Sequence, residues 1–123
     1  MLDHTGFNVS DYQRSKAFYE AALAPLGVTL LMEPAVGSGG FGRDEIPFFW
    51  IHERPPSVQG GLHIAFTAED RETVDAFHAA GLQAGGTDNG APGPRPIYHQ
   101  NYYGAFILDP NGNNIEAVCH KPA

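Results

Sequence analysis

Apolar and polar residues alternate in two stretches of the chain, and each alternation predicts a β-strand. The stretches are residues 2–9 (LDHTGFNV) and residues 62–68 (LHIAFTA). In each stretch a single histidine, His4 or His63, falls on the less apolar face, where the neighbouring side chains are small. The two histidines therefore hold the same place in two similar predicted strands.

The pattern after each of these strands predicts a helix and then further strands. The first helix is expected over 10–23, with Ser10 and Gln13 as a capping box, and the second over 70–82, with Asp70 as its N-cap. Further strands are expected at 28–33, 39–44, 46–53, weakly at 82–86, and at 102–109 and 113–120. DPNG, residues 109–112, is typical of a turn between the last two strands.

The two halves of the chain repeat each other. Shifting residues 4–27 by 59 positions onto 63–86 gives eight identities in 24 positions, where chance gives about one or two. The identical pairs are His4/His63, Phe7/Phe66, Asp11/Asp70, Ala17/Ala76, Phe18/Phe77, Ala21/Ala80, Leu23/Leu82 and Gly27/Gly86. A duplication explains this better than two unrelated units. The expectation is one domain over 1–123, made of two β-α-β-β-β modules, residues 1–55 and 60–123, joined by a linker.

The last predicted strand contains a carboxylate in an apolar stretch, Glu116 in IEAV. Because burying an unpaired carboxylate is costly, Glu116 is expected to face solvent or a cation. Matching the last strands of the two halves sets Trp50 opposite Glu116. Two imidazoles and one carboxylate, from His4, His63 and Glu116, can hold one divalent ion (Fe, Mn, Ni, Co or Zn) and leave positions open for water or substrate. The alternative is that both histidines are ordinary packing or surface residues.

Residues 85–104 are expected to form a long irregular loop, which in a compact domain is often functional. As a lid over a cavity, the loop would bring Arg95 to a substrate anion and provide hydrogen bonds or a general acid or base. The candidate side chains for the latter roles are Tyr98, His99, Tyr102 and Tyr103. The alternative is a rigid crossover with packed tyrosines.

Trp50 and Phe48 share one face of their predicted strand. They can stack on a planar ligand or fill the place of a missing metal ligand, and we favour filling. Three further residues receive expectations: His78 on the second helix faces solvent, Cys119 is a small core residue, and His120 is a distant alternative ligand.

The composition limits the classes of partner. The chain has 123 residues, 42% of them hydrophobic, and a formal charge of -7, which argues against nucleic acids and anionic membranes as partners. The charge also makes an anionic substrate the harder case. No apolar run is long enough to span a membrane. A single cysteine and no secretion signal fit a cytoplasmic protein. Exposed strand edges favour a homodimer.

These residues resemble the vicinal oxygen chelate superfamily, which includes glyoxalase I, bleomycin resistance proteins, extradiol dioxygenases and fosfomycin resistance enzymes. The resemblance covers the whole chain and rests on LDHTGFNVSDYQRSKAFYEAAL, HIAFTAEDRETVDAFHAAG and GAFILDPNGNNIEAV. It implies an α+β fold, with curved mixed sheets around a metal cavity that a second identical chain often completes. It assigns the metal ligands to His4, His63 and Glu116, and Glu116 is also a candidate catalytic residue.

The chain departs from glyoxalase I at Trp50, where that enzyme has a fourth, acidic ligand. Enzymes with three ligands, the dioxygenases and transferases, are the better match. The resemblance therefore predicts a metal-dependent enzyme of the lyase, dioxygenase or transferase type, which chelates a small oxygen-rich substrate through vicinal oxygens. The alternatives are a small-molecule binding or resistance protein without turnover, and a structural module of the same fold.

Overall fold

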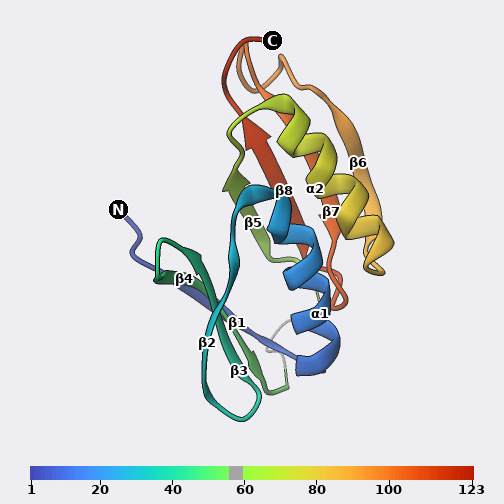
Figure 1. Ribbon diagram of the computed structural model, residues 1–123. Helices are drawn as coiled ribbons and strands as arrows, with labels where there is room; N and C mark the ends of the chain where they lie inside the picture. The colour runs from blue at the N-terminus through green and yellow to red at the C-terminus, as the bar shows by residue number, and fades with distance from the viewer. Residues whose placement is uncertain (56–59) are drawn as a thin grey trace.

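The computed structural model describes residues 1–55 and 60–123 and contains two four-stranded sheets with one long helix each (Figure 1). In chain order the elements are β1 (Thr5–Val9), α1 (Tyr12–Leu23), the 3-10 helix η1 (Ala24–Leu26), β2 (Thr29–Ala35), β3 (Ser38–Arg43), β4 (Ile46–Glu53), β5 (His63–Thr67), α2 (Arg71–Gln83), β6 (Thr87–Pro94), β7 (Tyr103–Leu108) and β8 (Asn114–Cys119). Sheet A has the order β1-β4-β3-β2 and sheet B the order β5-β8-β7-β6. The predicted α+β fold of two β-α-β-β-β units is confirmed.

The strand registers of the two sheets are equivalent. In sheet A, β1 runs parallel to β4 with Gly6 opposite Trp50, and in sheet B, β5 runs parallel to β8 with Ala65 opposite Glu116. Gly6 and Ala65 are related by the 59-residue repeat. Trp50 and Glu116 therefore hold matching positions in the two sheets, as the strand matching predicted.

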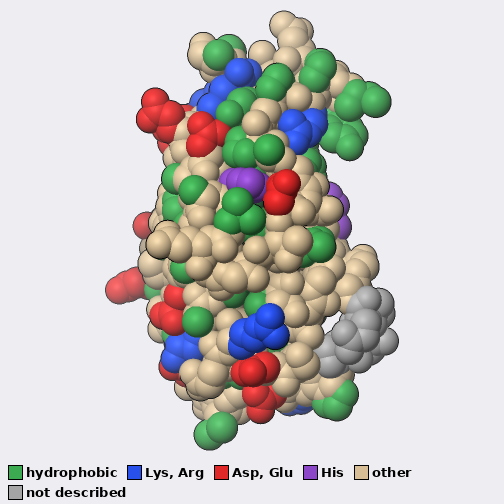
Figure 2. Space-filling model, turned by 90° about the vertical axis from the view of Figure 1, so that its right-hand side faces the viewer, with side chains coloured by type: hydrophobic (Ala, Val, Ile, Leu, Met, Phe, Trp, Pro, Cys, Tyr) green, Lys and Arg blue, Asp and Glu red, His purple; other side chains and the backbone are tan. Residues whose placement is uncertain are grey.

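Both helices lie on the same side of the molecule and cover one face of each sheet (Figure 1). One core runs through both halves: the ring centroids of Phe49 in sheet A and Phe66 in sheet B are 5.3 Å apart, and Tyr19 of α1 lies 4.9 Å from Phe49. Charged and apolar side chains are interspersed on the surface over the helices (Figure 2). No helix of residues 1–55 and 60–123 covers the other face of either sheet.

A buried aspartate links the turn between β7 and β8 to the first helix. Asp109 accepts hydrogen bonds from the Tyr19 hydroxyl and from the backbone N–H groups of Asn111 and Asn113. Burial and the neighbouring Asp109 charge raise the pKa of the Tyr19 hydroxyl well above its usual range, so Tyr19 remains a donor. The DPNG turn is confirmed, and it anchors sheet B to α1.

The N-cap of the first helix differs from the prediction. Asp11, not Ser10, caps α1, because its side chain accepts the Arg14 N–H at 3.1 Å. Ser10 instead accepts a hydrogen bond from the Asn111 side chain at 2.8 Å, a contact across 101 positions that a local pattern cannot indicate. The second predicted cap, Asp70, is confirmed by its 2.8 Å bond from the Thr73 N–H.

The predicted weak strand at 82–86 and the irregular loop over 85–104 are wrong in part. Helix α2 continues to Gln83, and β6 (Thr87–Pro94) pairs with β7 through an irregular antiparallel register. Its sequence, TDNGAPGP, has the composition of a loop. Pairing with β7 makes it a strand, with bulges that accommodate the glycines and prolines.

His78 was expected to face solvent but is 8% exposed. Its Nε2 lies 2.8 Å from Asp88 Oδ1, so it joins α2 to β6. The error follows from the previous one, because Asp88 belongs to the strand that the composition hid. Cys119 is a buried core residue, as predicted. Among the described residues, no helix has the length and apolar character needed to cross a membrane.

Candidate functional site

A buried carboxylate on sheet B is the centre of the candidate site. Glu116 is 1% exposed, and its Oε1 accepts a hydrogen bond from His63 Nε2 at 2.8 Å. Its Oε2 accepts a hydrogen bond from the Tyr102 hydroxyl. Of the two expected surroundings of Glu116, solvent or a cation, the structure rules out solvent, since the carboxylate is buried against His63 and Tyr102. Two of the predicted ligands, His63 and Glu116, lie in direct contact.

Strand alternation places these groups on one face. In β5, His63, Ala65 and Thr67 are exposed while Phe66 enters the core. Because Ala65 pairs with Glu116, the carboxylate points to the same face as the histidine. The third strand contributes Gly104, where an added Cβ would lie 3.1 Å from the Tyr102 ring and 3.2 Å from Glu116 Oε2. The glycine gives the tyrosine room to reach the carboxylate.

The electrostatics of this group favour a cation. A carboxylate withdrawn from water is costly unless it is paired. No Lys or Arg of the described residues forms an ion pair with Glu116; its partners are an imidazole and a phenol. Burial, followed by the hydrogen bond to Glu116, raises the pKa of the Tyr102 hydroxyl well above its usual range. Tyr102 thus stays protonated at neutral pH and donates to the carboxylate.

His4 lies apart from this pair. Its side chain is 61% exposed, and its Nδ1 lies 2.7 Å from Asp3 Oδ1. It lines a hollow of about 400 Å³ on sheet A, together with Gly6, Phe7, Asn8, Trp50 and His52. Within the described ranges, no three His, Cys, Asp or Glu side chains are grouped closely enough to hold an ion. A single chain therefore brings together His63 and Glu116 but not His4.

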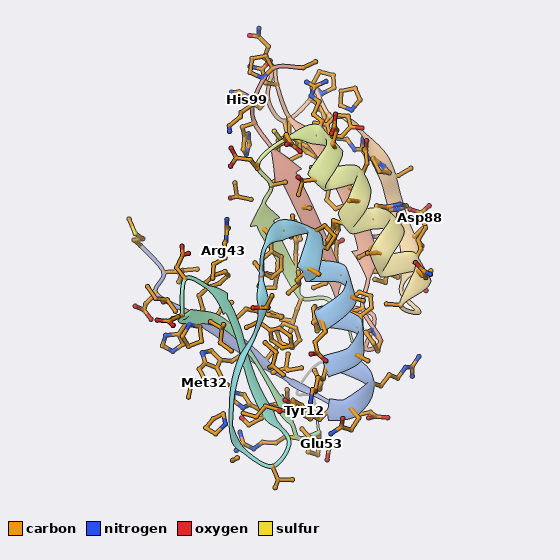
Figure 3. The ribbon with its side chains drawn as sticks, viewed as in Figure 1. Tyr12, Met32, Arg43, Glu53, Asp88 and His99 are labelled. Atoms are coloured by element: carbon orange, nitrogen blue, oxygen red, sulfur yellow. The ribbon has the colours of Figure 1, made fainter. Side chains whose placement is uncertain are left out.

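A larger cavity of about 560 Å³ lies between the edge strands β1 and β5. His4 and His63 both line it, with Phe48 and Phe49 from β4. Arg43 also lines this cavity and points from sheet A toward the space beside β5 (Figure 3). Phe48 thus lies where a bound molecule could contact it.

Trp50 forms an aromatic surface on sheet A where sheet B has its carboxylate. Its ring lies over Gly40, since an added Cβ there would be 2.7 Å from the indole. The indole stacks on His52 with 6.3 Å between ring centroids and an interplanar angle of 7°. Gly40 of β3 faces Trp50 as Phe106 of β7 faces Glu116. In sheet A the aromatic ring is on β4 and faces a glycine on β3, whereas in sheet B the aromatic ring is on β7 and faces the carboxylate on β8.

The segment after β6 lies at the end of sheet B. The Arg95 N–H donates to the Tyr102 carbonyl at 2.7 Å and closes this segment. Tyr98 is 64% exposed and its ring lies 5.1 Å from that of Tyr102. His99 lies near the C-terminal end in Figure 3, and its ring centroid is 5.6 Å from that of His120. The ring centroids of His120 and Tyr102 are 5.2 Å apart. The rings of Tyr98 and His120 therefore pack against Tyr102, the hydrogen-bond partner of Glu116.

Tyr103 is placed away from the candidate site, contrary to its predicted role in substrate contact. Its hydroxyl donates to Asp75 of α2 at 2.7 Å, and the Arg71 guanidinium carbon lies 4.9 Å from its ring centroid. The hydrogen bond to Asp75, followed by burial, raises the pKa of the Tyr103 hydroxyl. Tyr103 points away from the candidate site because neighbouring residues along a strand point to opposite faces, and Tyr102 points to the open face.

One residue of this surface was missed by the sequence reasoning. Phe106 pairs with Glu116 across the sheet, and its ring centroid lies 6.2 Å from that of His63. The signal was present in YYGAFILD, where Phe106 alternates with Ala105 and Ile107 and so points away from the core. An apolar residue on the open face of a strand often contacts a ligand or partner.

Two duplicated β-α-β-β-β units, with a histidine–carboxylate pair on an open sheet face, define a protein of the vicinal oxygen chelate class. The chain belongs to the Glyoxalase/Bleomycin resistance protein/Dioxygenase superfamily, whose family model matches residues 1–117. No curated protein matches the chain at a significant level.

Solved structures agree with this assignment. The chain is 32% identical to a glyoxalase/bleomycin resistance protein from Albidiferax ferrireducens, covering 97% of each chain with a TM-score of 0.80. It is similar in fold to lactoylglutathione lyase from Agrobacterium tumefaciens, with 18% identity, 97% and 92% coverage of the two chains and a TM-score of 0.69. It is also similar in fold to a glyoxalase/dioxygenase from Nostoc punctiforme, with 20% identity, 97% and 90% coverage and a TM-score of 0.70.

Proposed function

We propose that the protein is a metal-dependent enzyme that binds a small oxygen-rich substrate through two adjacent oxygens. The observation that carries this proposal is the pair of His63 and Glu116, whose imidazole and carboxylate are 2.8 Å apart on an open sheet face. Imidazole and carboxylate are a donor set that suits Fe, Mn, Co, Ni and Zn. A buried carboxylate without a Lys or Arg partner among the described residues gains most from such an ion.

His4 is the third proposed ligand, supplied by a second copy of the chain. Sheet A exposes His4 beside a hollow, and sheet B exposes His63 beside Glu116. In the part of the chain that the structure describes, no helix covers either open face, and β1 and β5 are both edge strands. A homodimer in which sheet A of one chain faces sheet B of the other would cover both faces and form two equivalent sites.

When bound, the ion would act as a Lewis acid on the chelating oxygens of the substrate. Tyr102 would hold Glu116 through one oxygen and leave the other, together with His63, directed at the ion. Trp50, from the opposite sheet, would exclude water and contact the substrate body. Phe48, Tyr98 and His99, at the margins of this surface, are the remaining candidates for substrate contact or proton transfer.

The test is metal binding by protein purified without chelators. We expect about one divalent ion per chain. The ion should stabilise the folded protein by about 2.7 kcal/mol at a concentration 100 times Kd. Glu116→Gln should abolish both the binding and the stabilisation. The metal-free variant should unfold at nearly the wild-type temperature, because the amide still accepts the Tyr102 hydrogen bond and no buried charge is left unpaired.

Two other results would contradict the proposal. A wild-type protein that stays metal-free with Fe, Mn, Co, Ni and Zn would favour a binding protein without turnover. A Glu116→Gln variant that still binds the ion would remove the carboxylate from the ligand set. Within the enzyme class, oxygen uptake with a catechol would identify a dioxygenase, and thiol consumption with an epoxide would identify a transferase.

A further inference from the structure

Arg95 lies on the same side of sheet B as Glu116. Its guanidinium carbon is 5.6 Å from the centroid of the Phe106 ring, and the His63 ring is 6.2 Å from the same centroid. Phe106 is also the cross-strand partner of Glu116. These groups therefore form one continuous surface. The Arg95 guanidinium lies at one end, the Phe106 ring in the middle, and His63 with Glu116, the proposed metal ligands, at the other end.

The guanidinium is held in place by the backbone of β6. Nη2 donates to the Ala91 carbonyl at 2.7 Å and Nη1 to the Pro94 carbonyl at 3.3 Å. Two glycines of β6 make room for it, since an added Cβ at Gly93 would be 3.1 Å from Nη1 and one at Gly90 would be 3.5 Å from Nη2. A cation that is already fixed loses little conformational entropy when it binds a ligand.

The charge of Arg95 is not neutralised. Lys16 and Lys121 form ion pairs with Glu33 and Glu69, but no carboxylate in the described part of the chain lies within ion-pairing distance of the Arg95 guanidinium. Carbonyl oxygens take up two of its five N–H donors, and those that remain suit a carboxylate or phosphate group.

We propose that the substrate is an oxyanion, whose carboxylate or phosphonate-type group pairs with Arg95 while two other oxygens reach the ion. The chelating half rests on the proposed function, but the contact with Arg95 does not need the metal. The net charge of -7 had made an anionic substrate the harder case. A fixed local cation outweighs that distant charge, because screening weakens charges farther away than about 8 Å at physiological salt.

The first experiment compares two diols that differ in one charge. Metal-loaded protein is titrated calorimetrically with protocatechuate and with protocatechuamide. We expect the acid to bind about tenfold or more tightly than the amide. Arg95→Gln should bind the two probes equally, with the affinity for the amide unchanged. Arg14→Gln, which removes one positive charge from the exposed face of α1, should keep the wild-type preference.

Three results of this titration would overturn the proposal: no preference in the wild type, a preference that persists in Arg95→Gln, or an equal loss of affinity for both probes in that variant. The last would mean that Arg95 only supports the hairpin after β6. Arg95→Lys should keep a reduced preference, because it retains the charge but not the fork of donors.

The second experiment separates this proposal from the metal site. Metal-free protein is titrated with benzoate, phenylphosphonate and benzamide while the side-chain N–H signal of Arg95 is followed by NMR. We expect benzoate or phenylphosphonate to shift the signal and benzamide to leave it in place, and comparison of the two anions identifies the preferred oxyanion. If neither anion shifts the signal, Arg95 is not an anion site, whether or not the protein binds a metal.

Discussion

At the scale of single residues, the environment of Glu116 determines what the site can bind. Both carboxylate oxygens have partners, His63 on one and Tyr102 on the other, so the carboxylate has one orientation. The equivalent position in sheet A is Trp50, which offers no ligand atom to an ion. At this one matched position the two halves differ, because sheet B has a carboxylate there and sheet A has an aromatic ring.

In the proposed metal site, Tyr102 would act on the ion only through its hydrogen bond to Glu116, which makes it a positioning residue. Tyr102→Phe should lower the affinity for a divalent ion by about tenfold or more, because loss of a hydrogen bond to a metal ligand lets the ligand reorient. The measurement is a competition titration against a chelator of known affinity. The phenyl ring keeps the packing against Tyr98 and His120, so the melting temperature of the metal-free variant should change little.

Tyr98→Phe is the matched control for this variant, since Tyr98 packs on the same ring but is 64% exposed. It should bind the ion as tightly as the wild type. An unchanged affinity in Tyr102→Phe, or an equal loss in both variants, would show that the hydrogen bond to Glu116 does not position the ligand.

At the scale of elements, periodic strands and helices were predictable and β6 was not. β1, β5, α1 and α2 have clear alternation or helical spacing, and the structure contains all four. β6 is rich in Gly, Pro and Asn, and its local sequence favours turns. It forms a strand because it pairs with β7, and the residues that pair, from Pro94↔Tyr103 to Thr87↔Leu108, are 9 to 21 positions apart in the chain. The contact between His78 and Asp88 could not be predicted for the same reason, because Asp88 lies in β6.

Asp88 supports β6 through charge, and this gives a dependence on pH. The Gly90 N–H, followed by His78, lowers the pKa of the Asp88 carboxyl. A lowered pKa in the folded state adds stability above the unfolded pKa of about 3.9, and this contribution is lost as the pH falls through the folded value. Asp88→Asn should therefore be less stable than the wild type near pH 7, and the difference should be smaller at about pH 3, which lies below the unfolded pKa. Urea unfolding at both pH values measures it; an undiminished difference in acid would contradict the charge argument.

At the scale of the whole molecule, the sequence predicted three metal ligands but not where the fold places them relative to one another. The repeat identified His4 and His63 as equivalent residues, and the last strand identified Glu116. The structure joins the last two and leaves His4 on the other sheet. Sequence periodicity predicts on which face of a strand a side chain lies. It does not predict which other sheet, in the same chain or in a second copy, packs against that face. That relation depends on how two open faces pack, which no local pattern contains.

The measurement that tests this account most directly is the metal content of a mixture of two variants, each of which lacks one proposed ligand. His4→Ala and His63→Ala are each expected to bind almost no ion as homodimers. If each site takes His4 from one chain and His63 with Glu116 from the other, a mixed dimer regains one intact site. Random exchange at equal amounts should then restore about a quarter of the wild-type metal content per chain. A mixture that exchanges subunits, shown by the appearance of a differently tagged heterodimer, yet stays as metal-poor as its parents would contradict the shared site.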